Sequence, residues 1–480
     1  MQKRFKNSIF ATSITGLMAL VGSASAEVIS VTVDRSQPFD EVSGYQYVEA
    51  TMDGVVWRDD GSQGEYSVPV VLIYPEADGN GIGVVDLPNS AQIHVTPGAS
   101  EWTVAQLTRS TTESYLFETG HTYLSVQWDK AVTETFGPAP PDDGSDFNHL
   151  AYGTIERGDD AFHIMRDAAF FLRNPSAFTG NGGPAPVDTV LSSGFSQTGG
   201  LINEFLARGE NTSGAFDGNL IGKQGLVCWT FHNEPPLYSH FSPCTDHPAS
   251  SDPSSVSIMI AAETDVILFD AASARTDAAN WRSYELAGVS HLPAPIFPGL
   301  HPNQNYANSQ QVFRAAIENL GLWAAEGIPA PSSKFIQGTI IPGGGLLPDL
   351  VPGLDGFEPE FDADGNALGG LRLPHMEQII DDKLAGAPLG TYTGINPVED
   401  LFVMIAGHFL PFSDAELEER YPNRGAYVSR VARAAEHLMD NGYILPHDKD
   451  AYVRGAARKP FQTKSDPRPP RAPWRVHPSR

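Results

Sequence analysis

A serine lies in the middle of a run of mostly small residues, Gly194-Phe195-Ser196-Gln197-Thr198-Gly199-Gly200. The run follows an apolar segment, residues 187–193, that is typical of a strand, and it precedes a helix-forming segment. In this setting a tight turn, the nucleophile elbow, lifts a serine hydroxyl out of the backbone and requires small residues two positions to either side. Gly194 meets that requirement, whereas Thr198 departs from it, and we expect the turn to open slightly there. The pattern predicts that Ser196 is a nucleophile.

A serine nucleophile needs a base and a group that orients the base. His291 follows the apolar run 284–289, and Asp265 follows the apolar run 256–262. Because α/β folds build their sites where strands end, we expect both side chains at the same edge of a sheet as Ser196. The sequence therefore predicts His291 as the base and Asp265 as the acid, with Glu263 on the same loop as the alternative acid.

Negative charge that develops on a substrate oxygen needs backbone donors, an oxyanion hole. The backbone N–H of Gln197, directly after the serine, is the first candidate. The second candidate is Asn89 or its neighbour Ser90, after the buried run 82–87. Asn89 could equally be a simple turn residue, since Asn is common in turns.

Strand-like and helix-like segments alternate along the chain around these residues. The expected strands cover residues 28–33, 45–48, 68–74, 82–87, 122–126, 187–193, 226–231, 256–262 and 284–289. The expected helices cover residues 159–173, 201–206, 310–326 and 427–441. Fully apolar strands indicate a sheet covered on both faces, so the fold class is α/β with a mainly parallel central sheet flanked by helices. From about residue 300 the chain becomes a helical and loop-rich C-terminal elaboration.

Several stretches together resemble the α/β-hydrolase superfamily, and the chain is similar to exported bacterial proteins described as α/β-hydrolase domain-containing. They are residues 83–89, 160–173, 194–199, 262–266, 282–291 and 365–374, so the resemblance runs from about residue 40 to 458. It implies the α/β-hydrolase fold and a hydrolase that uses Ser196, Asp265 and His291. In these proteins the residue after the elbow Gln is usually Ser, so Thr198 is a mild departure.

The first 26 residues have the features of a signal peptide. Lys3, Arg4 and Lys6 precede an apolar stretch, residues 9–21, and Ala24-Ser25-Ala26 offers a cleavage site before Glu27. About 13 apolar residues are too few to span a bilayer. We therefore expect a secreted or periplasmic protein that is not inserted in the membrane after cleavage.

Composition limits the partners. The 480 residues carry 58 Asp and Glu against 31 Lys and Arg, a net charge of −27, which becomes −30 once the three positive charges of the leader are removed. Such a charge argues against nucleic acid as a partner. We expect a signal peptide at 1–26, one catalytic unit at 27–458, and a disordered, basic, proline-rich tail at 459–480.

Two cysteines are too few for a Cys-rich zinc module. In an oxidising compartment Cys228 and Cys244 could form a disulfide, and two separate buried thiols remain the alternative. Residues 362–366 lack the later positions of a calcium loop and are expected to form an Asp-Gly turn. The aromatic residues around Trp229 and Phe241 could line a pocket or cover the sheet.

These features predict an exported serine hydrolase that cleaves a small-molecule or oligomeric carboxylic ester through an acyl-enzyme. No metal or cofactor is required. The alternatives are a lactone or amide hydrolase with the same residues, and a catalytically silent binding protein with this fold.

Overall fold

The structure is a computed structural model that describes residues 26–89, 115–129, 153–231, 239–294, 299–347, 353–376, 387–398 and 400–458. The expected signal peptide, apart from Ala26, and the expected basic tail lie outside the described residues, as does Ser90. The division into leader, catalytic unit and tail stays a prediction.

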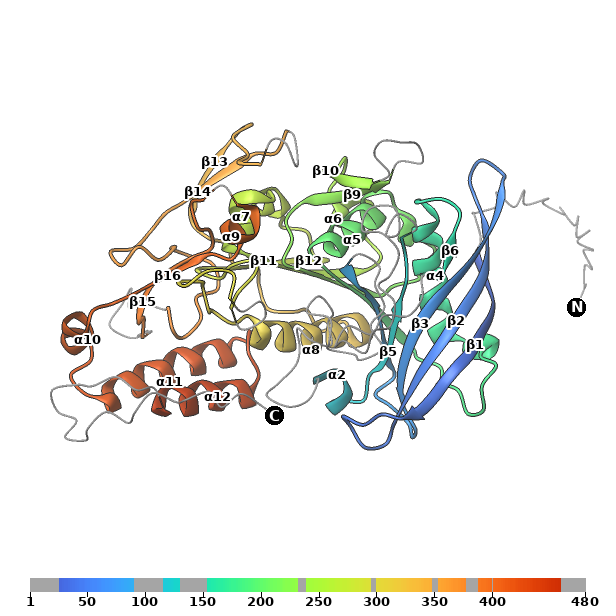
Figure 1. Ribbon diagram of the computed structural model, residues 1–480, viewed down its shortest axis with the longest axis horizontal. Helices are drawn as coiled ribbons and strands as arrows, with labels where there is room; N and C mark the ends of the chain where they lie inside the picture. Colours follow the sequence, from blue (N-terminus) through green and yellow to red (C-terminus); the bar gives the residue numbers. More distant parts are fainter. Residues whose placement is uncertain are drawn as a thin grey trace, which may run out of the picture.

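A ten-stranded sheet forms the centre of the molecule (Figure 1). Its strand order is β1-β2-β3-β5-β4-β7-β8-β11-β12, with β6 paired to β3. Its strands are β1 (Ala26–Pro38), β2 (Tyr45–Trp57), β3 (Gln63–Pro75), β4 (Ile82–Leu87), β5 (Thr122–Val126), β6 (Thr154–Ile155), β7 (Thr189–Phe195), β8 (Gly218–Gly222), β11 (Val256–Ala262) and β12 (Trp281–Leu286). From β5 to β12 all neighbouring strands are parallel. The strands β1, β2, β3 and β5 pair antiparallel. The prediction of a mainly parallel sheet is confirmed.

Helices cover both faces of the parallel part. They are α4 (Asp160–Arg173), α5 (Gln197–Ala207) and α8 (Gln310–Glu326), with the short α7 (Glu263–Leu268) after β11. α5 contacts β7 and β8, and α8 contacts β8 and β11. Figure 1 shows α5 and α8 on opposite sides of the sheet. The strands β7, β8 and β11 between them are buried almost throughout, so their sequences do not alternate between apolar and polar residues.

The central sheet differs from the prediction at the two-residue β6, which was not expected, and at residues 226–231. Residues 226–231 form β9 (Val227–Phe231), but β9 pairs with β10 (Ser239–Pro243) in a separate hairpin. The sheet strand in this place is β8, Gly-Asn-Leu-Ile-Gly, which cannot be recognised in the sequence because it is short and glycine-rich. A Cβ on Gly218 would lie 2.9 Å from Leu191, and one on Gly222 would lie 2.8 Å from Phe313. Glycine is therefore needed where the covering side chains approach the strand.

A disulfide joins Cys228 and Cys244, with a Cα–Cα distance of 5.0 Å. It links β9 to the residue directly after β10. Of the two states left open by the sequence, the structure has the disulfide. The bridge holds the two strands of the hairpin together, and α5, the helix that follows Ser196, packs on β9.

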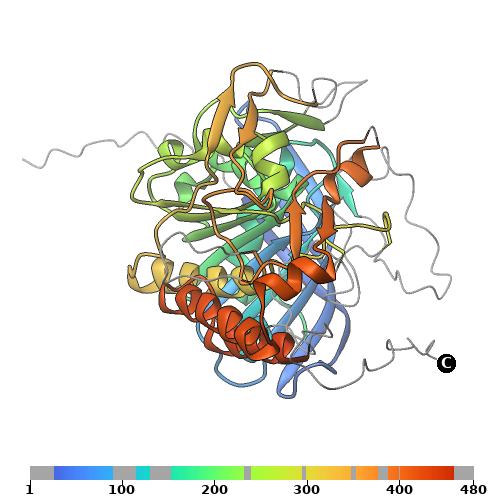
Figure 2. The ribbon, with the colours of Figure 1, turned by 90° about the vertical axis from the view of Figure 1, so that its left-hand side faces the viewer.

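The elaboration after residue 300 packs beside β12. Besides α8 it contains β13 (Gly338–Ile341), β14 (Gly356–Pro359), β15 (Gly390–Thr393), α9 (Leu401–Ile405), β16 (His408–Pro411), α10 (Asp414–Arg420), α11 (Arg424–Asp440) and α12 (Pro446–Arg458). α11 and α12 lie side by side, and Figure 2 shows this pair in front of the sheet. A buried ion pair between Arg314 of α8 and Asp448 of α12 attaches them to the body.

Residues 362–366 form the expected turn, in which Gly365 has a positive φ of 76°. Its carboxylates are paired, Asp362 with Arg372 and Asp364 with Arg420. Across the described ranges no group of His, Cys, Asp and Glu gathers as a metal site, and no helix is long and apolar enough to cross a membrane.

Candidate active site

Ser196 lies at the turn between β7 and α5, with φ 53° and ψ −112°. This is a strained conformation for a residue with a side chain, as the elbow requires. Its backbone N–H donates to Gly222 O at 2.9 Å, which attaches the turn to the end of β8. A Cβ on Gly194 would lie 2.4 Å from Thr198 O, so only glycine fits there. The local geometry is that of the predicted elbow.

Thr198 fits the elbow through its hydroxyl. Its Oγ1 accepts a hydrogen bond from Phe195 N at 2.7 Å and donates to Phe195 O at 3.1 Å, across the turn. Asn89 Oδ1 accepts from Thr198 N at 3.4 Å and lies 3.3 Å from Thr198 Oγ1. The structure thus brings Asn89, after β4, against the elbow. Gln197 is the first residue of α5 and follows Ser196 directly.

His291 connects Ser196 to Asp265. Its Nε2 lies 3.0 Å from Ser196 Oγ, and its Nδ1 lies 2.6 Å from Asp265 Oδ1. Asp265 is fully buried and His291 is 2% exposed, whereas Ser196 is half-buried. Three side chains that are far apart in the sequence therefore form one hydrogen-bonded chain that ends at a partly accessible hydroxyl.

The backbone around α7 fixes the acid and the imidazole. Asp265 Oδ2 accepts from Ala262 N at 2.6 Å, so both of its oxygens are used. His291 N donates to Thr264 Oγ1 at 2.9 Å, and that hydroxyl donates to Gly394 O. These contacts hold His291 in one orientation and connect it to the C-terminal elaboration.

Glu263, the alternative acid, points elsewhere. Its two carboxylate oxygens accept from the backbone N–H of Gly288 at 2.6 Å and of Gly394 at 2.9 Å. Burial raises the pKa of Glu263 to about 7, although these two hydrogen bonds oppose the shift. Glu263 joins two loops beneath the site, and Asp265 is the carboxylate that contacts His291.

Two residues beside the site were missed in the sequence. Lys223, directly after β8, is fully buried with φ 48°, and its Nζ donates to Ser290 O at 2.7 Å. Burial lowers the pKa of Lys223 to about 8, against the opposing effect of the Asp265 charge. Gln224 Nε2 donates to Ser196 O at 2.8 Å. The signal lay in the position of Lys223-Gln224 at the end of a strand, which the missed β8 concealed.

Apolar side chains surround the imidazole. The rings of Phe195 and Phe269 lie 5.8 and 5.7 Å from that of His291. Phe269 contacts Phe241 at 6.4 Å, and Phe241 contacts Trp229 at 4.8 Å, so these two aromatic residues extend a row of rings that begins at the site. The apolar cluster that contains Phe269 also includes Ile405 of α9. The elaboration therefore packs around the His291 end of the site.

A sequence profile described as "Alpha/beta hydrolase domain" matches residues 62–454. The chain belongs to this α/β-hydrolase family. The fold implied by the resemblance in the sequence is thereby confirmed, since the matched region contains the parallel strands, the elbow and His291.

Solved structures similar to this α/β hydrolase share little sequence with it. They include acetyl xylan esterase 1 from Thermoanaerobacterium, with 16% identity over 42% of this chain and 52% of that one, at a TM-score of 0.21. They also include the rice cell wall degrading esterase LipA from Xanthomonas oryzae, with 13% identity, 41% and 49% coverage and a TM-score of 0.25. A putative acetyl xylan esterase from Bacteroides fragilis has 10% identity, 54% and 69% coverage and a TM-score of 0.28. The chain spans about half the length of the first two. No curated protein matches it.

Proposed function

We propose that the protein is a serine hydrolase that cleaves carboxylic esters through an acyl-enzyme. The observation that carries this proposal is the hydrogen-bonded chain from Ser196 Oγ through His291 to Asp265 Oδ1. In this arrangement Ser196 attacks the ester carbonyl carbon while His291 Nε2 takes the hydroxyl proton. His291 then gives that proton to the departing alcohol, and water, activated by the same imidazole, releases the acid and restores Ser196.

Asp265 keeps the proton of the neutral imidazole on Nδ1 and stabilises the imidazolium that forms. Its second oxygen accepts from Ala262 N, so the carboxylate cannot rotate away from His291. The alcohol leaving group of an ester takes one proton, which His291 supplies.

For the oxyanion we propose backbone donors from Gln197 and Asn89. Gln197 N lies at the N-terminus of α5, where helix N–H groups and the helix dipole favour negative charge. The side-chain oxygen of Asn89 already accepts from Thr198, so the proposed contribution of Asn89 is its main-chain N–H.

We further propose that the protein acts outside the cytoplasm, secreted or in the periplasm. The sequence of residues 1–26 and the Cys228–Cys244 disulfide support this, since disulfides persist in oxidising compartments. The substrate class is a small-molecule or oligomeric ester.

Labelling with a fluorophosphonate tests the nucleophile. The wild type and Ser213→Ala, a change of an exposed serine, should form one adduct on Ser196 and hydrolyse short p-nitrophenyl esters. Ser196→Ala should do neither. An unlabelled wild type would support the silent binding protein instead. A labelled protein that cleaves lactones or anilides but no ester would support the other alternative.

A further inference from the structure

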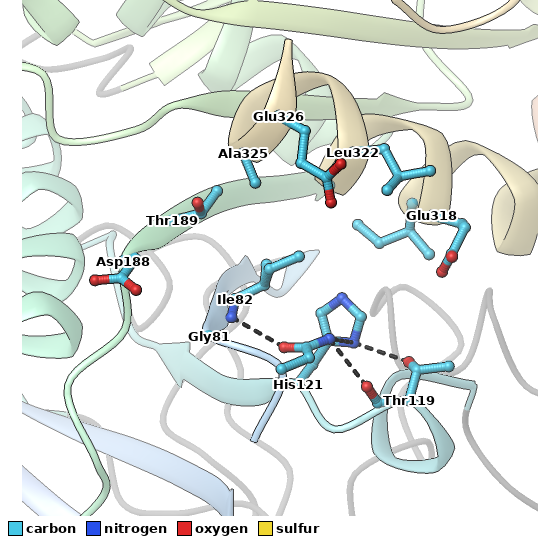
Figure 3. A pocket seen from close by; sticks show the side chains of 13 residues that line it. Gly81, Ile82, Thr119, His121, Asp188, Thr189, Glu318, Leu322, Ala325 and Glu326 are labelled. Carbon is cyan, nitrogen blue, oxygen red and sulfur yellow. Dashed lines mark hydrogen bonds between the residues drawn. The ribbon is translucent and has the colours of Figure 1, made fainter. Parts of the chain in front are cut away.

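A cavity of about 560 Å³ lies at the opposite end of the parallel strands from Ser196. Its walls come from the start of β4, the start of β7, the loop before β5 and the C-terminal half of α8 (Figure 3). Thr189 lines the cavity, and the strand that it begins ends at Phe195, next to Ser196. Seven residues of strand, about 23 Å, separate the two places. The cavity is therefore distinct from the proposed active site.

The imidazole of His121 faces into this cavity (Figure 3). His121 is 2% exposed, and within the described part of the chain its Nε2 has no hydrogen-bond partner. A buried polar atom without a partner costs about 1–3 kcal/mol, so such atoms in folded proteins call for an explanation. A ligand in the cavity would supply the missing contact once a small shift of the ring uncovers Nε2, which is itself buried.

The hydrogen-bond partners of the other ring nitrogen, Nδ1, determine whether Nε2 is a donor or an acceptor. Nδ1 lies 2.9 Å from Thr119 Oγ1 and 3.2 Å from Leu116 O. The Thr119 hydroxyl donates to Tyr115 O at 2.8 Å, so its oxygen is left to accept, and a carbonyl only accepts. Asn80 Nδ2, at 3.1 Å from Nδ1, also donates to Thr119 O. Two of the three neighbours of Nδ1 accept and only Asn80 Nδ2 donates, so we place the proton on Nδ1 and the lone pair on Nε2.

His121 stays neutral near pH 7, because burial lowers its pKa to about 4. Its Nε2 therefore requires a ligand that donates a hydrogen bond.

Among the described residues that line the cavity, the charged side chains all have one sign. Asp188, Glu318 and Glu326 contribute carboxylates, and neither Lys nor Arg is among the residues that line it. Tyr115 Oη donates to Glu318 Oε2 at 3.0 Å and so fixes that carboxylate. Ile82 and Leu322 add apolar surface between the polar groups. Such walls fit a positively charged group on a short apolar body.

We propose that the cavity binds a small organic cation, an ammonium or guanidinium compound, whose N–H groups donate to His121 Nε2 and to the carboxylates of Glu318 and Glu326. The volume of the cavity lies within the range of small-molecule sites, about 300–1,000 Å³. An organic cation is favoured over a metal ion, since the described residues offer no cluster of three ligating side chains.

Calorimetric titration of the full mature chain with butylguanidinium tests this proposal, with 1-butanol as the neutral probe and butyrate as the anion. We expect saturable binding of butylguanidinium but not of 1-butanol or butyrate, and 0.5 M NaCl should weaken this binding. Glu326→Gln, at an exposed position, and His121→Phe should each raise the Kd by about tenfold or more. Glu358→Gln, the same change at an exposed position in β14 that does not line the cavity, should leave the Kd unchanged.

Ser196→Ala should bind butylguanidinium like the wild type, which separates this proposal from the proposed hydrolase activity. Absence of binding would overturn the inference. Binding of 1-butanol as tight as that of butylguanidinium would also overturn it. So would an unchanged Kd for butylguanidinium in Glu326→Gln, even if His121→Phe weakens binding.

Discussion

The substitution Asp265→Asn tests the central assignment of the site. One oxygen of Asp265 lies 2.6 Å from His291 Nδ1 and the other accepts from Ala262 N at 2.6 Å. An amide cannot serve both donors. If its oxygen stays on Ala262, the NH₂ group faces Nδ1 and moves the imidazole proton to Nε2, where it blocks transfer from Ser196.

The size of the effect follows from the charge. A carboxylate about 4 Å from the forming imidazolium contributes about 4 kcal/mol at an effective dielectric constant of about 20. That energy corresponds to a factor of about 10³ in rate, and the wrong tautomer brings the expected loss of kcat to about 10⁴. The assay is kcat on p-nitrophenyl acetate, with urea unfolding as the check that the variant is folded.

Glu263→Gln is the matched control, because Glu263 is a buried carboxylate two residues away that bonds only to Gly288 N and Gly394 N in the described contacts. We expect it to keep kcat within about tenfold, since it removes one backbone contact and no charge beside the imidazole. The reasoning is refuted if folded Asp265→Asn retains activity while folded Glu263→Gln loses it.

Three further predictions concern the framework of the site, each measured by urea unfolding. Gly194→Ala should lower the unfolding free energy by about 1–3 kcal/mol, because the new Cβ would lie 2.4 Å from a backbone oxygen. The control Gly455→Ala lies on an open helix surface and should raise the unfolding free energy by up to about 1 kcal/mol. Equal stability of the two variants would contradict the proposed crowding. The Cys228–Cys244 disulfide closes a loop with a separation of 16 residues, so its reduction should lower the unfolding free energy by about 3 kcal/mol. An unchanged urea midpoint would show that the disulfide does not constrain the chain. The pKa of Lys223 is lowered from 10.5 to about 8 in the folded state, so the folded protein loses this proton at a lower pH than the unfolded chain. The unfolding free energy should therefore increase between pH 8 and 10.5, by about 3 kcal/mol in total. Lys223→Met should lack that increase, and a variant that matches the wild type at every pH would refute it.

The sequence predicted the parts of the site that follow long apolar strands. Ser196, Asp265 and His291 each come shortly after a run that could be recognised as a strand from its composition alone. Their meeting then follows from the rule that parallel strands end at one edge of the sheet. The resemblance to the α/β-hydrolase family led to the same three residues.

The strand and the residues that the sequence did not predict depend on packing between distant elements, which no local sequence pattern indicates. β8 was overlooked because its two glycines are required by Leu191 and Phe313, which come from other elements. Without β8, Lys223 and Gln224 had no visible relation to the site. The second half of β3, residues 68–74, is as apolar as the parallel strands yet pairs antiparallel with β2 and β5.

The order in which the chain supplies the site has a consequence for folding. Ser196 and His291 are 95 residues apart, and β8, β11 and β12 must all join β7 before the two side chains can meet. Contacts between such distant segments form slowly, because the intervening loops must close first. A nascent or truncated chain that ends before residue 291 therefore lacks the base. Esterase activity should return during refolding only with the last phase that completes the sheet, so enzyme activity would serve as a probe of late folding.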